Sequence, residues 1–92
     1  MFNASQRKRV IEAINAEAQR SKGVAGRKVR GIMSDEHKAN AVVDVMYRRA
    51  ARQNPGAGDG ELLKIVLEWI KDGGLTAIAQ FIAAVAAIFI RI

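Results

Sequence analysis

The stretch that decides the fold of this protein is GGLTAIAQFIAAVAAIFIRI, residues 73–92. Arg91 is its only residue with a formal charge. At about 100° per residue, the bulky side chains fall within about 140° of arc on a helix. These are Leu75, Ile78, Phe81, Ile82, Val85, Ile88, Phe89 and Ile92. The opposite side carries Thr76, Gln80, Ala83, Ala87 and Arg91. The pattern predicts a helix with one bulky face and one small face.

Two surroundings fit this helix, and the sequence leaves both open. In a bilayer the bulky face would meet lipid, and Thr76 and Gln80 would hydrogen-bond across a helix–helix contact on the small face. The uncharged run 75–90 would be about 24 Å long, short against a hydrocarbon core of about 30 Å, with Trp69 at the near interface. In a soluble protein the bulky face would instead fill the core of a homo-oligomer, because so large an exposed patch would aggregate.

The residues before this stretch complete the prediction of an all-α protein. Apolar residues at helical spacing predict helices at about 4–21 and 35–53, within a basic region that covers 1–53. Asn3 and Gln6 are spaced as in a capping box at the first helix start. Ser34 is a candidate N-cap of the second.

The segments that follow each have a distinct composition. Residues 54–60, NPGAGDG, hold the only proline and predict a hinge. Residues 61–72 predict an amphipathic helix with one narrow charged stripe, and 73–92 form the hydrophobic C-terminal helix. No alternation typical of strands occurs, so we expect a basic helical half joined to a hydrophobic helix pair.

Residues 22–33 are rich in glycine and basic side chains, which predicts a loop. Gly23, Gly26 and Val29 have a spacing that resembles the G-x-x-G-x-x-V loop of KH domains, which clamps a nucleic-acid backbone between two helices. Ser21 and Lys22 stand where that family has apolar residues, and no strands are predicted beside the helices. We therefore interpret the segment as a basic linker.

Positive charge is concentrated in the first half of the chain. Residues 1–52 hold twelve Lys and Arg and five Asp and Glu, a net charge of +7, whereas 53–92 carry −1. Such clusters neutralise nucleic-acid phosphates or anionic lipid head groups, or contact an acidic protein surface. The candidate polyanion-binding residues are Arg7, Lys8, Arg9, Arg27, Lys28, Arg30, Arg48, Arg49 and Arg52.

No catalytic chemistry is indicated by the side chains. The chain has no cysteine, and His37 is its only histidine, which argues against disulfides, thiolate metal sites and catalytic triads. Asp35 and Glu36 fit a helix start, and Glu61 and Glu68 alternate with lysines at ordinary helical spacing. We expect a non-enzymatic protein without metal, cofactor or small-molecule substrate.

The leading hypothesis is a small structural protein, anchored by its tail in a membrane or membrane-bearing assembly, whose basic arm contacts nucleic acid, lipid head groups or an acidic scaffold. Its general build is similar to that of minor virion proteins. The sequence leaves two alternatives, namely a soluble helical homo-oligomer with a nucleic-acid-binding or assembly role and a holin-like pore former. We expect membrane association without a cleavable signal peptide, because the first ten residues contain no apolar run.

Overall fold

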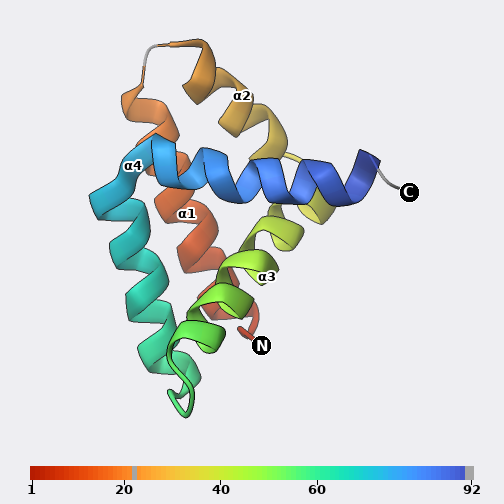
Figure 1. The fold of residues 1–92 in the computed structure, drawn as a ribbon. Coiled ribbons are helices and arrows are strands. Elements are labelled where there is room, and N and C mark those ends of the chain that lie inside the picture. Colours follow the sequence, from red (N-terminus) through yellow and green to blue (C-terminus); the bar gives the residue numbers. More distant parts are fainter. Residues whose placement is uncertain (22, 91–92) are drawn as a thin grey trace.

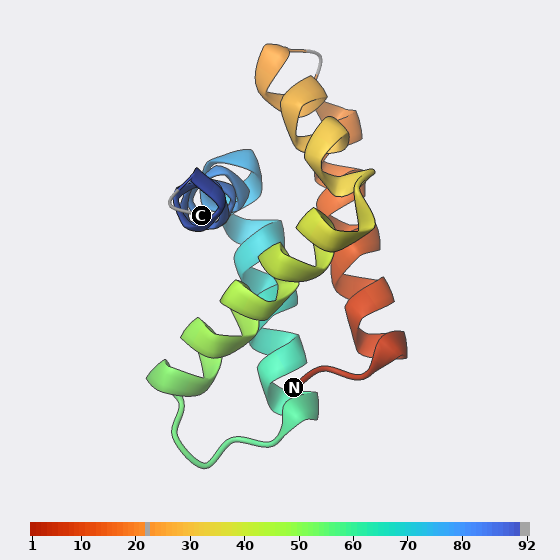
Figure 2. The ribbon, with the colours of Figure 1, turned by 90° about the vertical axis from the view of Figure 1, so that its right-hand side faces the viewer.

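A computed structural model describes the backbone of residues 1–21 and 23–90 and the side chains of 1–21 and 23–87. In these residues the chain forms helices α1 (Ala4–Arg20), α2 (Val24–Met33), α3 (Glu36–Gln53) and α4 (Asp59–Ile90), and no strand. The predicted all-α fold is confirmed. Figures 1 and 2 show α2 returning beside the end of α1, α3 descending to the opposite end of the molecule, and the second half of α4 lying across the other helices.

The starts of α1 and α3 are capped by polar side chains that accept hydrogen bonds from free backbone N–H groups. The Asn3 side chain accepts from the N–H of Gln6 at 2.8 Å, and the Gln6 side chain accepts from the N–H of Asn3 at 2.9 Å, the capping box that the sequence predicted. At α3 the cap is Asp35, which accepts from the N–H of Lys38. The prediction of Ser34 as this cap was wrong, since its hydroxyl donates to the carbonyl of Gly31 at the end of α2.

The prediction of a loop at 22–33 was also wrong, because Val24–Met33 form α2. Val29 and Met33 lie one turn apart and are buried, so the packing of this face outweighs the low helix propensity of glycine. Gly23 is the N-cap and Gly26 lies inside the helix, so neither belongs to a KH-like clamping loop. A Cβ on Gly26 would lie 2.7 Å from the Ala18 carbonyl oxygen, which explains the glycine as a point of close contact with α1.

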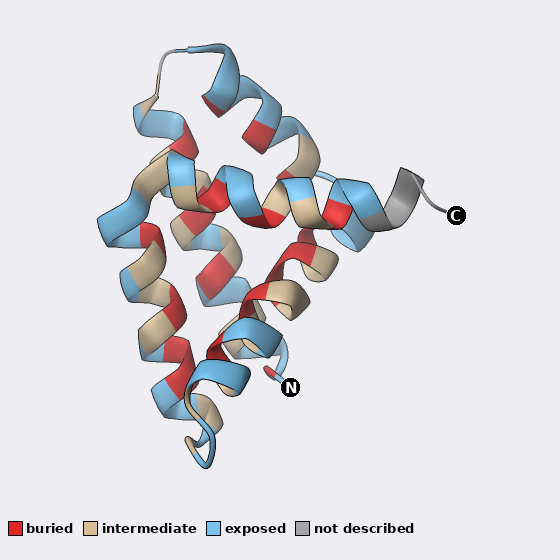
Figure 3. Cartoon of the chain, in the orientation of Figure 1, coloured by how far each residue is buried: buried red, intermediate tan, exposed pale blue. Residues whose placement is uncertain are grey.

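A single apolar core joins all four helices, as Figure 3 shows by the buried stripes that face one another. Helix α2 contributes Val29 and Met33 to this core. The fully buried large side chains of the core are Val10, Ile14, Val42, Val43, Met46, Leu62, Val66, Ile70 and Ile78.

Helix α4 is broken at Gly74, where φ is 57° and ψ is −145°. This positive φ is strained for residues with a Cβ and is readily adopted by glycine. The break falls at the second residue of the predicted C-terminal helix 73–92, and α4 starts at Asp59, inside the predicted hinge 54–60. The second half of α4 therefore leaves the direction of the first and crosses the molecule (Figure 1).

We predict opposite effects for alanine at two glycines of α2. Gly26→Ala should lower the free energy of unfolding by about 1–3 kcal/mol, because its Cβ would press on the α1 backbone. Gly31→Ala should raise it by about 0.5–1 kcal/mol, because a Cβ there meets no atom within 4 Å and alanine favours the helix. Urea unfolding followed by circular dichroism measures both. Equal effects of the two variants would contradict the close contact at Gly26.

Candidate binding surfaces

The bulky face of the C-terminal helix is buried against the chain's own helices. Ile78, Phe81 and Val85 are 0%, 4% and 4% exposed, and Leu75 and Ile82 pack against the same core. From the sequence alone, lipid or a second copy of the chain was expected to cover this face. The side chains of Ile88 and Phe89 lie outside the described residues.

The small face of the same helix points away from the core. Thr76, Gln80, Ala83 and Ala87, the predicted helix–helix contact residues, are all exposed. With Ala25 at the start of α2, this face lines a shallow apolar hollow. The tertiary fold therefore uses one side of the helix for the core and leaves the other side uncovered.

Arg7 differs from the other predicted polyanion-binding residues because the fold uses its charge internally. Its guanidinium donates to the Asp44 carboxylate at 2.5 Å, to the Asn40 side chain at 3.3 Å and to the Phe2 carbonyl at 3.0 Å. The Arg7 and Asp44 side chains are only 20% and 25% exposed. Arg7 therefore ties α1 to α3 and is not free to neutralise a phosphate.

The other eight predicted cations are exposed, and they come from three helices. Lys8 and Arg9 lie on α1, a further three on α2 (Arg27, Lys28, Arg30) and three in the last turns of α3 (Arg48, Arg49, Arg52). Neither 24–33 nor 45–58 contains an acidic residue. No ion pair within the described part of the chain involves the α2 and α3 cations. These two segments are therefore two basic surfaces without an ion pair in the described residues.

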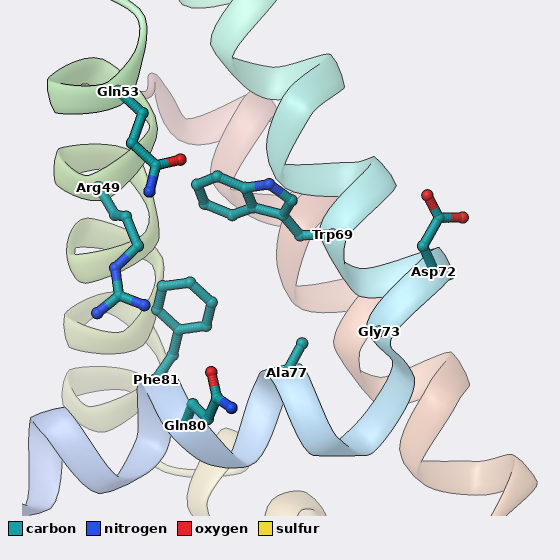
Figure 4. A pocket seen from close by; sticks show the side chains of 8 residues that line it. All are labelled: Arg49, Gln53, Trp69, Asp72, Gly73, Ala77, Gln80 and Phe81. Carbon is teal, nitrogen blue, oxygen red and sulfur yellow. The ribbon is translucent and has the colours of Figure 1, made fainter.

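An aromatic cluster lies beside the α3 basic surface, where α4 breaks at Gly74; this break is called the elbow of α4. Trp69 precedes the break at Gly74 and Phe81 follows it, and their rings stack with centroids 5.7 Å apart and planes 18° from parallel. The Arg49 guanidinium lies 4.8 Å from the centre of the Phe81 ring. Figure 4 shows these three side chains converging with Gln53 on one recess.

Sequence reasoning missed this cluster. Trp69 was interpreted as a membrane-interface residue, and Phe81 was assigned to the bulky face of a separate helix. The contact requires the turn at Gly74, whose direction no local pattern encodes. Gly73 and Gly74 are adjacent in the sequence, and such a pair favours a helix break but gives no information on which residues meet across it.

Tyr47 of α3 and the N-terminal segment both contact Asp59, the first residue of α4. The Tyr47 hydroxyl donates to the Asp59 carboxylate at 2.7 Å, and its ring meets that of Phe2 edge-on at 4.8 Å between centroids. The terminal ammonium of Met1 lies 3.8 Å from the other Asp59 oxygen. The hydrogen bond to Asp59, followed by burial and the charge of Asp59, raises the pKa of Tyr47 above its ordinary value.

One helix in the described part of the chain is long and apolar enough to cross a membrane, judged by length and composition: Asp59–Ala87, of which 22% of the most apolar window is buried. The break at Gly74 lies inside it. Among the residues whose side chains are described, no three His, Asp or Glu groups gather as metal ligands.

Comparisons with protein-family models, with curated proteins and with solved structures found no match to this chain.

We predict that Arg7→Gln lowers the free energy of unfolding by about 1–2 kcal/mol, because it leaves the partly buried Asp44 without its cation. Lys8→Gln, an exposed neighbour on the same helix, should change it by less than about 0.5 kcal/mol. Thermal and urea unfolding measure both variants. An Arg7→Gln protein as stable as Lys8→Gln would show that Arg7 contributes nothing to the α1–α3 contact.

The only tyrosine allows a direct test of the contact with Asp59. Ultraviolet absorbance of the phenolate should give a pKa above the usual value of about 10, and Asp59→Asn should bring it back towards that value. Because the folded pKa is raised, the contribution of this contact to stability is complete below pH about 10 and is lost as pH rises through the folded pKa. Glu61→Gln, also in the first turn of α4, should leave the titration unchanged.

Proposed function

We propose that this protein is a small non-enzymatic nucleic-acid-binding protein. Its fold presents two basic surfaces without an ion pair in the described residues, one on α2 and one at the end of α3. The observation that carries the proposal is the six exposed cations on segments without any carboxylate, outside every ion pair of the described residues. Phosphate contacts of this kind bind nucleic acid without reading its sequence.

The distribution of these cations favours an extended partner. Figure 1 places α2 at one end of the molecule and the last turns of α3 at the other, and the longest dimension of the molecule is 38 Å. A nucleic-acid backbone supplies phosphates continuously over such a length. Insertion into a lipid surface would need exposed large apolar side chains, and those of the described surface are Met1 and Val24.

The test is binding of a labelled oligonucleotide to the full-length protein, followed by fluorescence anisotropy across a range of salt concentrations. The triple variant Arg27→Gln, Lys28→Gln, Arg30→Gln should bind more weakly. The slope of log K against log salt concentration should be smaller by about 2.7 on a duplex probe and by about 2.1 on a single strand, since each lost phosphate contact removes about 0.9 or about 0.7, respectively. The matched control Lys64→Gln, Lys71→Gln changes exposed lysines that share a stripe with Glu61 and Glu68, and should leave the slope unchanged. Salt-independent binding, or no binding, would contradict the proposal.

Membrane anchoring through α4 is the second candidate, favoured by the length and hydropathy of Asp59–Ala87. A span would require the helix to straighten at Gly74 or to give up the burial of Ile78 and Phe81. Fractionation of cells that express the full-length chain tests this candidate. An anchored protein should leave the membrane only with detergent, whereas release by salt or carbonate would exclude the anchor.

A membrane-anchored protein could also self-associate through the exposed small face of the C-terminal helix. If Thr76 and Gln80 hydrogen-bond between membrane helices, the double variant Thr76→Val, Gln80→Leu should weaken the oligomer by about 1–2 kcal/mol. Both side chains are exposed in the monomer, so the variant should keep its fold. Analytical ultracentrifugation in detergent measures the oligomer. An unchanged mass distribution would remove this face from the assembly.

A further inference from the structure

The recess at the elbow of α4 combines a flat aromatic surface, a cation that forms no ion pair with the described residues and two amides (Figure 4). Trp69 is half-buried, and its indole is supported from below by Phe81, which is itself 4% exposed. An indole held in this way is already oriented before any ligand arrives. The part of Trp69 that remains accessible opens into the recess beside Arg49.

We propose that this recess seats one unstacked base of a single-stranded nucleic acid. The inference rests on the proposed function and adds to it the form of nucleic acid that is bound. Single-strand binding proteins pair a basic groove for the backbone with an aromatic side chain on which a base stacks. In this chain Trp69 supplies the aromatic surface, and the α3 basic surface supplies the cations.

The charges around the recess fix how a strand would enter it. Arg49 and Asp72 lie on opposite sides of the recess (Figure 4). Arg49 retains its N–H donors, because its contact with Phe81 involves a ring and not a carboxylate. Arg52 follows it by one turn of α3. The backbone phosphates therefore pass on the α3 side, and the carboxylate of Asp72 keeps them away from the other side.

The polar groups of the recess tolerate any base. Gln53 and Gln80 line it from α3 and α4, and each side-chain amide can both donate and accept a hydrogen bond. Such groups can reorient to match the edge of a purine or a pyrimidine. The bases of a duplex remain stacked and paired, so they cannot reach Trp69, and the recess distinguishes single strands from duplexes.

Trp69 is the only tryptophan of the chain, so its fluorescence reports on this recess alone. A short oligothymidylate should quench its emission saturably, whereas a duplex of equal length should bind without quenching. Trp69→Leu should weaken binding of a labelled oligothymidylate by roughly 5- to 150-fold, the range for one stacked base, and should leave duplex binding unchanged. Trp69→Phe keeps an aromatic ring, so its affinity for oligothymidylate should fall less than that of Trp69→Leu.

The unmodified protein provides the control that does not depend on the fold of a variant. An abasic oligonucleotide of the same length carries the phosphates without the bases, and it should bind more weakly than oligothymidylate and should not quench Trp69. The triple variant of α2 (Arg27→Gln, Lys28→Gln, Arg30→Gln) should bind all three probes more weakly. Saturating oligothymidylate should still quench its Trp69 emission. Binding of the abasic strand as tight as that of oligothymidylate, with Trp69 emission unchanged, would overturn the base site and leave the phosphate contacts standing. Binding of none of the probes would overturn both proposals.

Discussion

The backbone at Gly74 is the constraint on which the rest of the structure depends. Its positive φ divides α4 into two helices, and only the resulting change of direction allows the second half to lay its bulky face across the molecule. Ile78, Phe81 and Val85 then join the core formed by α1 and α3. Burial of three large side chains is worth several kcal/mol, which is comparable to the total stability of a domain of this size.

The same turn creates the features that bear on function. It brings Phe81 under Trp69 and beside Arg49, so that an arginine near the end of one helix faces aromatic rings from another. It also turns the small face of the C-terminal helix outward, where Thr76 and Gln80 are exposed. Core, recess and uncovered face are therefore consequences of one glycine conformation. A conformational change at this elbow would alter all three together.

Charge has two separate roles in this molecule, and its position in the sequence does not distinguish them. Arg7 belongs to the same basic cluster as Lys8 and Arg9, yet it forms an ion pair with Asp44 and so links α1 to α3. The cations of α2 and the end of α3 have no such partner among the described residues. This division is what turns a net positive charge into particular surfaces on which a polyanion could bind.

The sequence by itself determined the all-α class, the capped start of α1, the break before the C-terminal helix and the division of that helix into a bulky and a small face. These are local properties, set by periodicity, capping side chains and glycine. It did not predict α2, because the helix is held by the packing of Val29 and Met33 and by the close contact of Gly26 with α1. It also did not reveal what covers the bulky face or that Trp69 lies near Arg49. Those outcomes depend on the direction in which the chain turns at Gly74, and only the sum of contacts across the core decides that direction.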